Sequence, residues 1–379
     1  MHSVESCWGG IAVRILQLGK FYDPATGGME TVLKSICENL CDRVDFQVLV
    51  ANTSFHTEKE FRKFPIIRAA SLGTLFSMSL APTYPSWATK LDADMIHVHM
   101  PNPLAEFSAM RVDRAVPILA HFHSDIVRQK RLLKVYRPLL EAFYRRAKCI
   151  ILPSPRHADV SPFVAQHRDK CRVVPFGIDL FRFDLDSEQE KKTQELRDGP
   201  PAVLCVGRLV SYKGIEFLIR AIQNMNSRLW IVGTGPLELE LKDLVRKLGM
   251  QNRVTLLGEL TGRDLASYYH ACEVFALPSV TNAEMFGIVQ LEAMACRKPV
   301  VSSNLPTGVS WVNQHGVTGL LVAPASVEEL TKAISTLLGN RRLREEMGEA
   351  GRARVEKMFT SQKMASDLLQ IYGDLLSGV

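Results

Sequence analysis

Hydrophobic and polar positions in the first half of the chain repeat one pattern, in which a short apolar run leads through a polar loop into a stretch with helical spacing. The first repeat combines a strand-like run at 13–18, a glycine-containing turn at 23–28 and a helix expected over 29–40. Further β-rich runs follow, with helix-compatible stretches between most of them, at 46–50, 95–99, 116–120, 149–152 and 171–174. Short apolar strands that alternate with helices are typical of a parallel sheet covered on both faces.

The same alternation restarts in the second half of the chain. Between the halves, residues 184–201 are charged, poor in apolar residues and closed by a Gly-Pro-Pro triplet, which is typical of a linker or its edge. Beyond them, apolar runs predict strands at 202–206, 229–232, 254–257, 274–277 and 299–301. The sequence therefore predicts an α/β protein of two doubly wound, Rossmann-like domains, residues 1–182 and 183–359. Ligands of such sheets bind beyond the carboxyl ends of the strands, so we expect a shared site in a cleft that both domains face.

The composition of the 379-residue chain, 46% hydrophobic and 23% charged, is that of a folded protein with room for two cores. Its eight cysteines include no C-x-x-C pair, which favours reduced thiols in a cytosolic protein. There is no uncharged apolar run of membrane-spanning length and no signal-peptide pattern, so any membrane association is expected to be peripheral.

The net charge of +6 resides in the first half, because residues 1–180 hold 23 basic and 17 acidic side chains. Residues 111–148 alone contain ten basic and three acidic side chains. This basic stretch is either a solvated helix face or a surface for anionic lipid headgroups or a phosphorylated substrate. A nucleic-acid partner is not expected, since no nucleic-acid-binding signature accompanies the charge.

Two glutamates lie close together in the tract 278–295. A helix is expected over 286–295, with Glu284 at its mouth and Glu292 on roughly the same face inside it. Glu292 has apolar neighbours, and a carboxylate in such surroundings needs donors, which sugar hydroxyls provide well. An anion or a sugar oxygen is also expected to meet the free backbone N–H groups of the helix start, those of Phe286, Gly287, Ile288 and Val289. The alternative is an acidic N-terminal cap with a helix salt bridge.

Two loops are candidates for binding phosphate. Arg208 and Lys213 follow the strand expected at 202–206, and two fixed cations in a glycine-bordered turn suit a diphosphate whose charge grows as it departs. Gly27 and Gly28 precede a helix, where glycines let a phosphate approach the backbone and the helix presents its positive end. Each motif alone has a plain alternative, surface cations in the first case and a tight turn in the second.

Histidines follow the strand expected at 116–120. His121, His123 and Asp125 come just after it, and hence near the expected cleft. A metal site is not expected, because an i, i+2 pair of histidines has no further ligands in view. The segment from Gly233 to Gly235 lacks the third glycine of a dinucleotide fingerprint and is interpreted as a turn.

This ordered set of motifs carries a resemblance to a known family. With Gly27-Gly28, His123, Arg208/Lys213 and Glu284/Glu292 at strand ends and split across two domains, the chain from about Val13 onward resembles the retaining GT-B glycosyltransferases of family 4. Within the family it is most similar to bacterial mannosyl- and rhamnosyltransferases that build O-antigen and related lipid-linked polysaccharides of the cell surface. The segments that indicate this subgroup are 19–22, 123–131, 174–179 and 305–313.

The resemblance implies a role for each motif. Glu292 is implied to bind the ribose hydroxyls of a nucleotide sugar, and Glu284 to bind the transferred sugar with the N–H groups of 286–289. Arg208 and Lys213 are implied to hold the diphosphate, Gly28 to close over it from the other domain, and His123 to contact the sugar near its reacting carbon. The base is implied to lie by the loop after 254–258 and around Glu273. The last stretch, 360–379, is implied to be a helix that packs back on the first domain.

The function implied is metal-independent transfer of a hexose, mannose or a rhamnose-type sugar, from a nucleotide diphosphate sugar to a lipid-linked or saccharide acceptor. No cofactor is implied, GDP-mannose is the favoured donor, and the leaving diphosphate takes the acceptor's proton. We expect the enzyme in the cytoplasm, in peripheral contact with the anionic inner face of the cytoplasmic membrane through 111–148. The alternatives are a UDP-sugar-dependent transferase with a soluble acceptor, a GT-B sugar-nucleotide epimerase, and a non-catalytic sugar-nucleotide sensor. A nicotinamide-dependent oxidoreductase lacks its fingerprint here.

The sequence departs from the family at one position. Arg297 stands where the family usually has a glycine, at a helix end where a left-handed backbone is expected. We expect a local cost in stability and do not infer inactivity from this residue.

Overall fold

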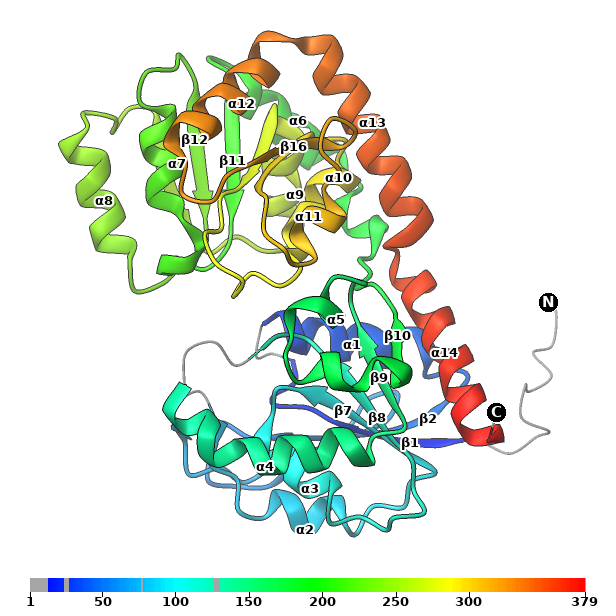
Figure 1. Cartoon of the computed structure of the whole chain (residues 1–379). Helices are drawn as coiled ribbons and strands as arrows, with labels where there is room; N and C mark the ends of the chain where they lie inside the picture. The colour runs from blue at the N-terminus through cyan, green and yellow to red at the C-terminus, as the bar shows by residue number, and fades with distance from the viewer. Residues whose placement is uncertain (1–12, 24–26, 76–77, 126–129, 379) are drawn as a thin grey trace, which may run out of the picture. The chain divides into compact units, whose positions relative to one another are not determined.

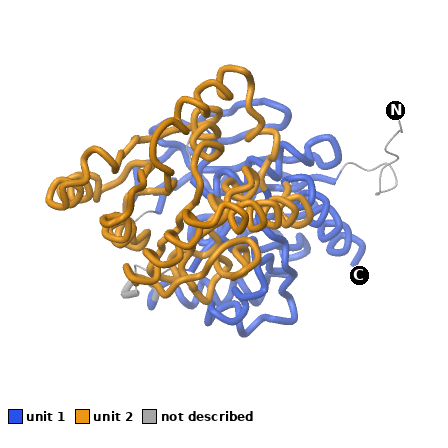
Figure 2. Tube along the Cα trace, turned by 90° about the horizontal axis from the view of Figure 1, so that it is seen from above, with its two compact units in different colours: residues 1–177, 361–379 blue, residues 178–360 orange. Residues whose placement is uncertain are grey.

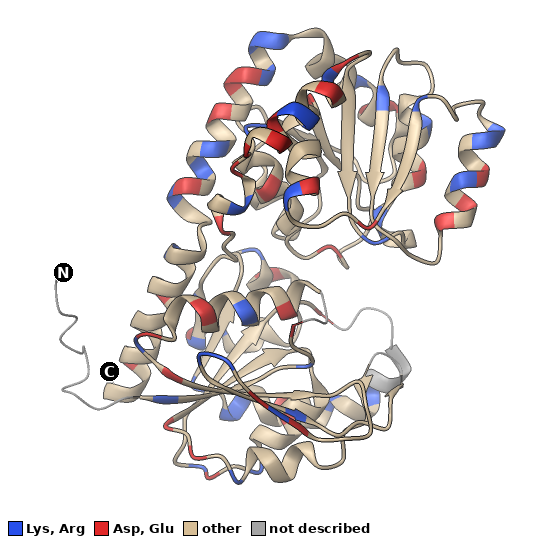
Figure 3. Ribbon diagram, turned by 180° about the vertical axis from the view of Figure 1, so that it is seen from behind, with Lys and Arg blue, Asp and Glu red and all other residues tan. Residues whose placement is uncertain are grey.

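The computed structural model describes residues 13–23, 27–75, 78–125 and 130–378, and leaves the side chains of 130–133 aside. The described chain divides into two compact units, one formed by the chain up to Gly177 together with the residues from Ser361 onward, the other by Ile178–Thr360 (Figure 2). In both units most charged residues lie on the helices and loops, and few lie on the strands (Figure 3).

The first unit is built on a sheet whose strands are β1 (Arg14–Leu18), β2 (Asp45–Ala51), β3 (Glu58–Phe61), β4 (Pro65–Ala69), β7 (Met95–Met100), β8 (Ile118–Phe122), β9 (Cys149–Leu152) and β10 (Cys171–Val173). Their order is β10-β9-β8-β7-β1-β2-β4-β3, and all neighbours are parallel except the edge pair β3 and β4. β5 (Thr74–Leu75) and β6 (Met78–Ser79) form a separate two-stranded ribbon.

The helices of the first unit are α1 (Gly28–Leu40), α2 (Tyr84–Ala88), α3 (Pro103–Ala109), α4 (Lys130–Arg146), α5 (His157–Val160), the 3-10 helix Val164–Lys170 and α14 (Ser361–Ser377). The last helix, α14, packs against α1 (Figure 1). Its buried face includes Leu368, Ile371 and Tyr372. The end of the chain thus completes the core of the unit in which the chain begins.

The second unit is built on an all-parallel sheet of β11 (Ala202–Val206), β12 (Arg228–Val232), β13 (Val254–Gly258), β14 (Val274–Leu277), β15 (Val300–Ser303) and β16 (Gly319–Val322). The strand order is β13-β12-β11-β14-β15-β16. This is the doubly wound order, in which strands are added first on one side of the first strand and then on the other. The change of side falls between the first and fourth strands, here β11 and β14. The predicted fold class, α/β with two doubly wound domains, is confirmed.

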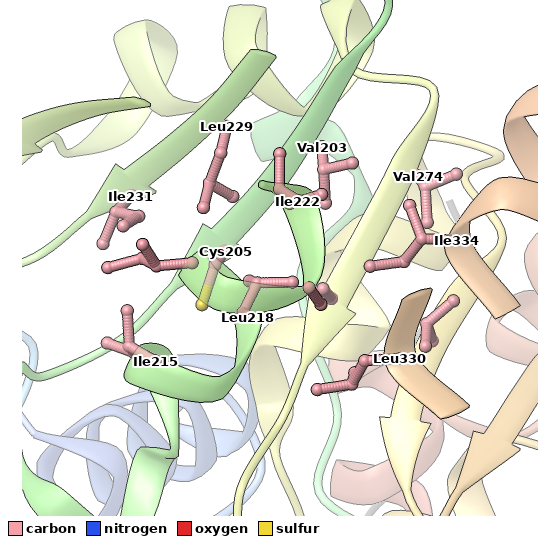
Figure 4. Close-up of a cluster of buried hydrophobic side chains, with 14 of the residues drawn as sticks. Val203, Cys205, Ile215, Leu218, Ile222, Leu229, Ile231, Val274, Leu330 and Ile334 are labelled. Carbon is pink, nitrogen blue, oxygen red and sulfur yellow. The ribbon is translucent and has the colours of Figure 1, made fainter. Parts of the chain in front are cut away.

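Helices of the second unit cover this sheet: α6 (Ser187–Arg197), α7 (Ile215–Ile222), α8 (Glu238–Lys247), α9 (Gly262–Ala271), α10 (Ile288–Ala295), α11 (Val309–Val312), α12 (Val327–Gly339) and α13 (Arg341–Met358). On one face, Leu218 and Ile222 of α7 and Ile334 of α12 pack onto Val203 and Val274 of the strands (Figure 4). Burial of such side chains stabilises the unit by about 1.5–3 kcal/mol each.

One expectation about the middle of the chain is wrong. Residues 184–201, expected to be a linker or its edge, contain the helix α6, which packs against α9. Asp186 caps this helix by accepting hydrogen bonds from the N–H groups of Glu188 and Gln189, in a capping box completed by the Gln189 side chain. The charged residues that suggested a linker are the solvent face of the helix. Among the described helices, none is both long and apolar enough to cross a membrane.

Candidate functional site

The strongest candidate site lies in the second unit, at the carboxyl ends of β11 and β14. Ligands of doubly wound sheets bind where the strand order reverses, and these two strands flank that point. The loop after β11 contacts the loop after β14 closely, because a Cβ on Gly214 would lie 2.3 Å from the carbonyl oxygen of Pro278. The N–H of Val280 also donates to the carbonyl of Tyr212 at 2.8 Å. Only glycine allows this approach, and Gly214 also adopts a left-handed backbone with φ of 63°.

These loops bring Lys213 and Glu284 together. The Nζ of Lys213 lies 2.5 Å from Oε2 of Glu284, and the two side chains are only 12% and 10% exposed. The hydroxyl of Ser279 donates to the same carboxylate oxygen at 2.8 Å, and that of Thr307 donates to the backbone carbonyl of Glu284 at 2.7 Å. Burial alone would lower the pKa of Lys213, but the Glu284 carboxylate beside it raises that pKa above its ordinary value. The lysine is therefore a fixed positive charge at neutral pH.

Arg208 lies in the same loop but is exposed. Its side chain makes no ion pair or hydrogen bond with any residue that the structure describes. The turn after β12 packs closely against the Arg208 loop. A Cβ on Gly233 would lie 2.2 Å from the carbonyl oxygen of Gly207, and the N–H of Leu209 donates to the carbonyl of Thr234. The segment from Gly233 to Gly235, interpreted from the sequence as a plain turn, thus supports the Arg208 loop by packing against it.

The second glutamate occupies a different environment from the first. Glu292 lies on α10 and accepts a hydrogen bond from the hydroxyl of Tyr269 at 2.7 Å. Burial raises its pKa, and the Tyr269 hydrogen bond offsets only part of that rise. The helix expected over 286–295 begins only at Ile288, and Glu284 lies in the loop that leads into it.

A glycine explains the late helix start. Gly287 has a left-handed backbone with φ of 71°, and a Cβ there would lie 2.6 Å from Leu277. Of the four N–H groups expected to meet a ligand, those of Ile288 and Val289 are in the first turn of α10. Those of Phe286 and Gly287 belong to the loop before it. The ring of Phe286 is buried against Trp311 and Phe359, so this residue also anchors the loop.

In the first unit, Gly27 and Gly28 lie at the start of α1, as expected for a phosphate-binding turn. The Cα of Gly28 faces open space. The side chain of Glu30, however, bends back to this helix start, because a Cβ on Gly27 would lie 2.3 Å from its Oε2. Burial raises the pKa of Glu30. A phosphate at this turn therefore meets a carboxyl group that the sequence motif did not reveal.

His123 follows β8 and is 9% exposed. Its Nε2 lies 2.9 Å from Nδ1 of His99, and its ring stacks on Phe176 with ring centroids 5.1 Å apart. Burial holds its pKa well below the ordinary value, so the imidazole is neutral at neutral pH. Asp125, two residues later, accepts a hydrogen bond from Ser161 at 2.8 Å.

Comparison with known proteins identifies the family. The family model described as "Glycosyltransferase Family 4" matches residues 26–182, and that described as "Glycosyl transferases group 1" matches residues 186–354. The D-rhamnosyltransferase WbpZ of Pseudomonas aeruginosa is 32% identical over 92% of this chain and 93% of its own length. The chain belongs to the family 4 glycosyltransferases. The O-antigen chain mannosyltransferase C of Escherichia coli is 30% identical over 96% of this chain and 99% of its own length.

The fold agrees with this assignment. The solved structure of HepE from Anabaena in complex with UDP-glucose superposes with a TM-score of 0.77, at 22% identity, over 95% of this chain and 99% of the other. The fold of the chain is that of the GT-B glycosyltransferases. The resemblance inferred from the ordered motifs is confirmed, and the chain is a glycosyltransferase.

One residue of the predicted site lies elsewhere in this glycosyltransferase. Glu273, expected near the nucleotide base, precedes β14 at the amino edge of the sheet, whereas Arg208, Lys213 and Glu284 follow the strands at the carboxyl edge. Its carboxylate accepts a hydrogen bond from the N–H of Ala202 at 2.5 Å, where β11 begins. Glu273 thus orders the start of a strand and is not part of the group around Lys213.

Three features of this glycosyltransferase were missed by sequence reasoning. Tyr269 positions Glu292, Gly214 allows the two loops to touch, and Glu30 covers the start of α1. Tyr269 lies on a helix with no local motif, so the sequence contains no signal for it. Gly214 follows Lys213 directly, and its place between a loop and a helix was the available signal for a left-handed turn.

Proposed function

We propose that this glycosyltransferase transfers a hexose, mannose or a rhamnose-type sugar, from a nucleotide diphosphate sugar to a lipid-linked or saccharide acceptor in surface polysaccharide biosynthesis. The observation that carries the proposal is the group at the carboxyl ends of β11 and β14: an exposed Arg208, a charged Lys213 and a fixed Glu284 carboxylate. Cations suit a diphosphate, and a carboxylate suits sugar hydroxyls.

The group supports departure of a nucleoside diphosphate. When the bond from the sugar's anomeric carbon to the phosphate oxygen breaks, negative charge grows on the diphosphate, and Arg208 and Lys213 stabilise it. Glu284 keeps Lys213 charged through the reaction, because it faces the ammonium at 2.5 Å in a buried place. The two cations supply the charge that a divalent metal supplies in other transferases, which supports a metal-independent reaction.

The proposed stereochemistry is retention. The acceptor hydroxyl forms a bond to the anomeric carbon on the face that the diphosphate leaves, and its proton passes to the departing phosphate oxygen. Bonds and charges balance without a base from the chain. Glu292 is proposed to bind the ribose hydroxyls through the carboxylate oxygen that Tyr269 does not occupy.

The choice of sugar rests on the relatives. Both full-length relatives named above transfer D-rhamnose or mannose according to their names. We therefore favour GDP-mannose or a GDP-deoxysugar as donor. A UDP-sugar is the main alternative, since HepE, of the same fold, was solved with UDP-glucose.

A transfer assay tests the proposal. The enzyme is incubated with GDP-mannose, GDP-rhamnose, dTDP-rhamnose or UDP-glucose and with octyl α-mannoside, an acceptor with a lipid-like tail, and products are analysed by mass spectrometry and NMR. The expected result is an α-linked product from a GDP-sugar. An epimerised nucleotide sugar without acceptor product would assign an epimerase instead, and a β-linked product from GDP-mannose, an α-linked donor, would refute retention.

Arg208→Gln is the decisive variant, because the exposed Arg208 side chain has no partner among the described residues and can be changed without affecting the fold. It should lower transfer roughly tenfold or more, the value of charge-assisted hydrogen bonds to the diphosphate, at unchanged melting temperature. Arg220→Gln, which changes another exposed arginine of the same unit, is the matched control and should transfer like the parent. Equal activity of the two variants would refute the role of Arg208.

Peripheral membrane contact through the basic stretch 111–148 is part of the proposal. Lys134, Arg137, Arg145 and Lys148 are exposed there. Arg146 is not available for lipid, because its guanidinium donates to the backbone carbonyls of Ala109, Val112 and Asp113. Exposed cations of this kind attract anionic headgroups by about 1 kcal/mol each. We therefore place the enzyme at the inner face of the cytoplasmic membrane.

Vesicle sedimentation tests the membrane contact. A variant with Gln at Lys134, Arg137, Arg145 and Lys148 should bind phosphatidylglycerol vesicles more weakly than the parent. The control carries Gln at four exposed cations of the second unit, Lys332, Arg341, Arg342 and Lys357. Equal loss of binding in both variants would show a net-charge effect and refute a localised surface.

A further inference from the structure

Next to His123, the first unit buries a row of polar side chains on one face of its sheet. Gln17 lies on β1, His97 and His99 lie on β7, His121 lies near the end of β8, and His123 directly follows that strand. These strands are neighbours, with Gln17 opposite His97 and His99 opposite His121. All but His123 are fully buried. Buried polar groups are kept in a core only when hydrogen bonds satisfy them, so it matters which group donates and which accepts in each bond.

All four histidines are neutral, because burial holds their pKa values well below the ordinary value, and that of His121 falls to about 3. A neutral imidazole has one N–H donor and one acceptor nitrogen. If one ring nitrogen of a histidine donates, its other ring nitrogen must accept, so the donor in one hydrogen bond of the row determines the donor in the next.

The orientation of the Gln17 amide gives the bonds from Gln17 to His123 a single direction. The amide oxygen of Gln17 can only accept, so His99 donates to it from Nε2, at 3.0 Å. That leaves Nδ1 of His99 as an acceptor, and the nitrogen facing it at 2.9 Å is Nε2 of His123. His123 must then donate from Nε2, and its Nδ1 carries a lone pair.

The structure orients the Gln17 amide with its nitrogen toward His97 and Tyr372, and this orientation sets the direction of every bond in the row. Its Nε2 donates toward Nδ1 of His97 and toward the hydroxyl of Tyr372 on α14, both at 3.3 Å. The Tyr372 hydroxyl lies 2.8 Å from the same His97 nitrogen and donates to it. His97 then donates from Nε2 to Nδ1 of His121, at 3.1 Å. The last helix of the chain is thus connected to His123 through one hydrogen-bonded row.

We propose that Gln17 and His99 are positioning residues that hold His123 as its Nε2-protonated tautomer, so that Nδ1 is presented as a hydrogen-bond acceptor to a hydroxyl of the bound sugar. The proposal rests on the proposed function for the identity of the ligand. Two observations support it besides the bond directions. Among the residues that the structure describes, none contacts Nδ1 of His123 through a hydrogen bond, and the ring is held in place by stacking on Phe176. A nucleotide sugar whose sugar has a hydroxyl facing Nδ1 should then bind more tightly than one without that hydroxyl.

A metal ion is the competing explanation for such a cluster. One nitrogen from each of His97, His99 and His121 lies within 4.8 Å of the others. Both nitrogens of His97 and both of His99 are already paired, however, with Tyr372, Gln17, His121 and His123. Among the ring nitrogens of these three histidines, only Nε2 of His121 has no hydrogen-bond partner in the described chain. A metal ion needs three or four protein ligands, and one free nitrogen does not supply them, so hydrogen bonding explains the row better than a metal does.

Nitrogen NMR of the enzyme labelled with ¹⁵N-histidine tests the tautomer directly, because protonated and unprotonated ring nitrogens have well-separated shifts. The His123 signal is assigned from a His123→Gln variant. We expect Nε2 of His123 to be protonated and Nδ1 unprotonated in the parent. An Nδ1-protonated ring, a cationic ring, or a stoichiometric metal found by elemental analysis would each overturn the proposal.

Matched variants at position 99 test the positioning role. His99→Asn keeps an acceptor near the place of Nδ1, whereas His99→Leu offers none. We expect the Asn variant to keep the tautomer and the parent KM for the donor sugar. The Leu variant should show both tautomers of His123 and a KM raised roughly two- to tenfold, the value of one hydrogen bond. Parent-like tautomer and KM in the Leu variant would overturn the proposal.

The two proposals fail in distinguishable ways. The NMR measurement needs no substrate, so a correct tautomer in a protein that transfers no sugar would refute the proposed function alone. An active transferase whose His123 is protonated at Nδ1 would refute the positioning role alone.

Discussion

The buried pair of Lys213 and Glu284 makes a sharp prediction about stability. Replacing Lys213 with Met leaves the Glu284 carboxylate, only 10% exposed, without its cation. Removing one partner of a buried pair costs about 3–5 kcal/mol, because an unpaired charge stays buried. For a unit of this size, each kcal/mol lowers the melting temperature by about 2–4 °C, so a fall of about 6–20 °C is expected.

Scanning calorimetry and urea denaturation measure this effect. Trp230 and Trp311 lie in the second unit, and their fluorescence follows its unfolding. The double variant Lys213→Met/Glu284→Gln retains neither charge, so it should lose less stability than the two single variants together.

The matched control is Lys242→Met, which removes a lysine that is paired with Glu238 at 2.7 Å but half-exposed. It should cost at most about 1 kcal/mol, since water screens such pairs. A Lys213→Met variant that melts like Lys242→Met, or a double variant whose cost is the sum of the two single costs, would refute a buried, unpaired Glu284 carboxylate as the cause.

Two further predictions concern groups outside the site. Arg297→Gly should raise the stability of the second unit by about 1 kcal/mol in urea denaturation, because Arg297 has a left-handed backbone with φ of 55°, and a destabilised variant would refute the strain. Glu106 is fully buried on α3, and burial raises its pKa to about 8, so the folded state loses stability as pH rises from about 4.5 to 8. Glu106→Gln removes that loss: its advantage over the parent should grow between pH 5 and 8, to at most about 5 kcal/mol, whereas a pH-independent difference would contradict the shift.

Much of the fold could be predicted because buried parallel strands are continuous apolar runs. The run at 202–206 coincides with β11, and that at 274–277 coincides with β14. The strand β4 was not predicted, because Arg68 interrupts its apolar run. Its guanidinium is satisfied by the carbonyls of Tyr22 and Asp23, residues far away in sequence. The helix α6 was not predicted, because it is rich in charged residues and poor in apolar ones, which is typical of a linker.

The site could be predicted in part for a similar reason. Arg208, Lys213 and Glu284 each follow a strand, and the carboxyl ends of parallel strands share an edge. Glu273 was misplaced because it precedes its strand, and local sequence does not show that Ala202 needs its carboxylate as an acceptor. The pairing of Lys213 with Glu284 depends on the approach of two loops at Gly214, which no local pattern reveals.

Calorimetric titration with GDP tests most directly whether the group around Arg208 and Lys213 binds a nucleoside diphosphate. The expected result is one GDP per chain, bound roughly tenfold or more weakly by Arg208→Gln and equally well by Glu273→Gln, which alters the opposite edge of the sheet. UDP and dTDP, titrated in parallel, report the choice of base. Absence of binding for all three diphosphates, or equal affinity of the parent and Arg208→Gln, would contradict the account.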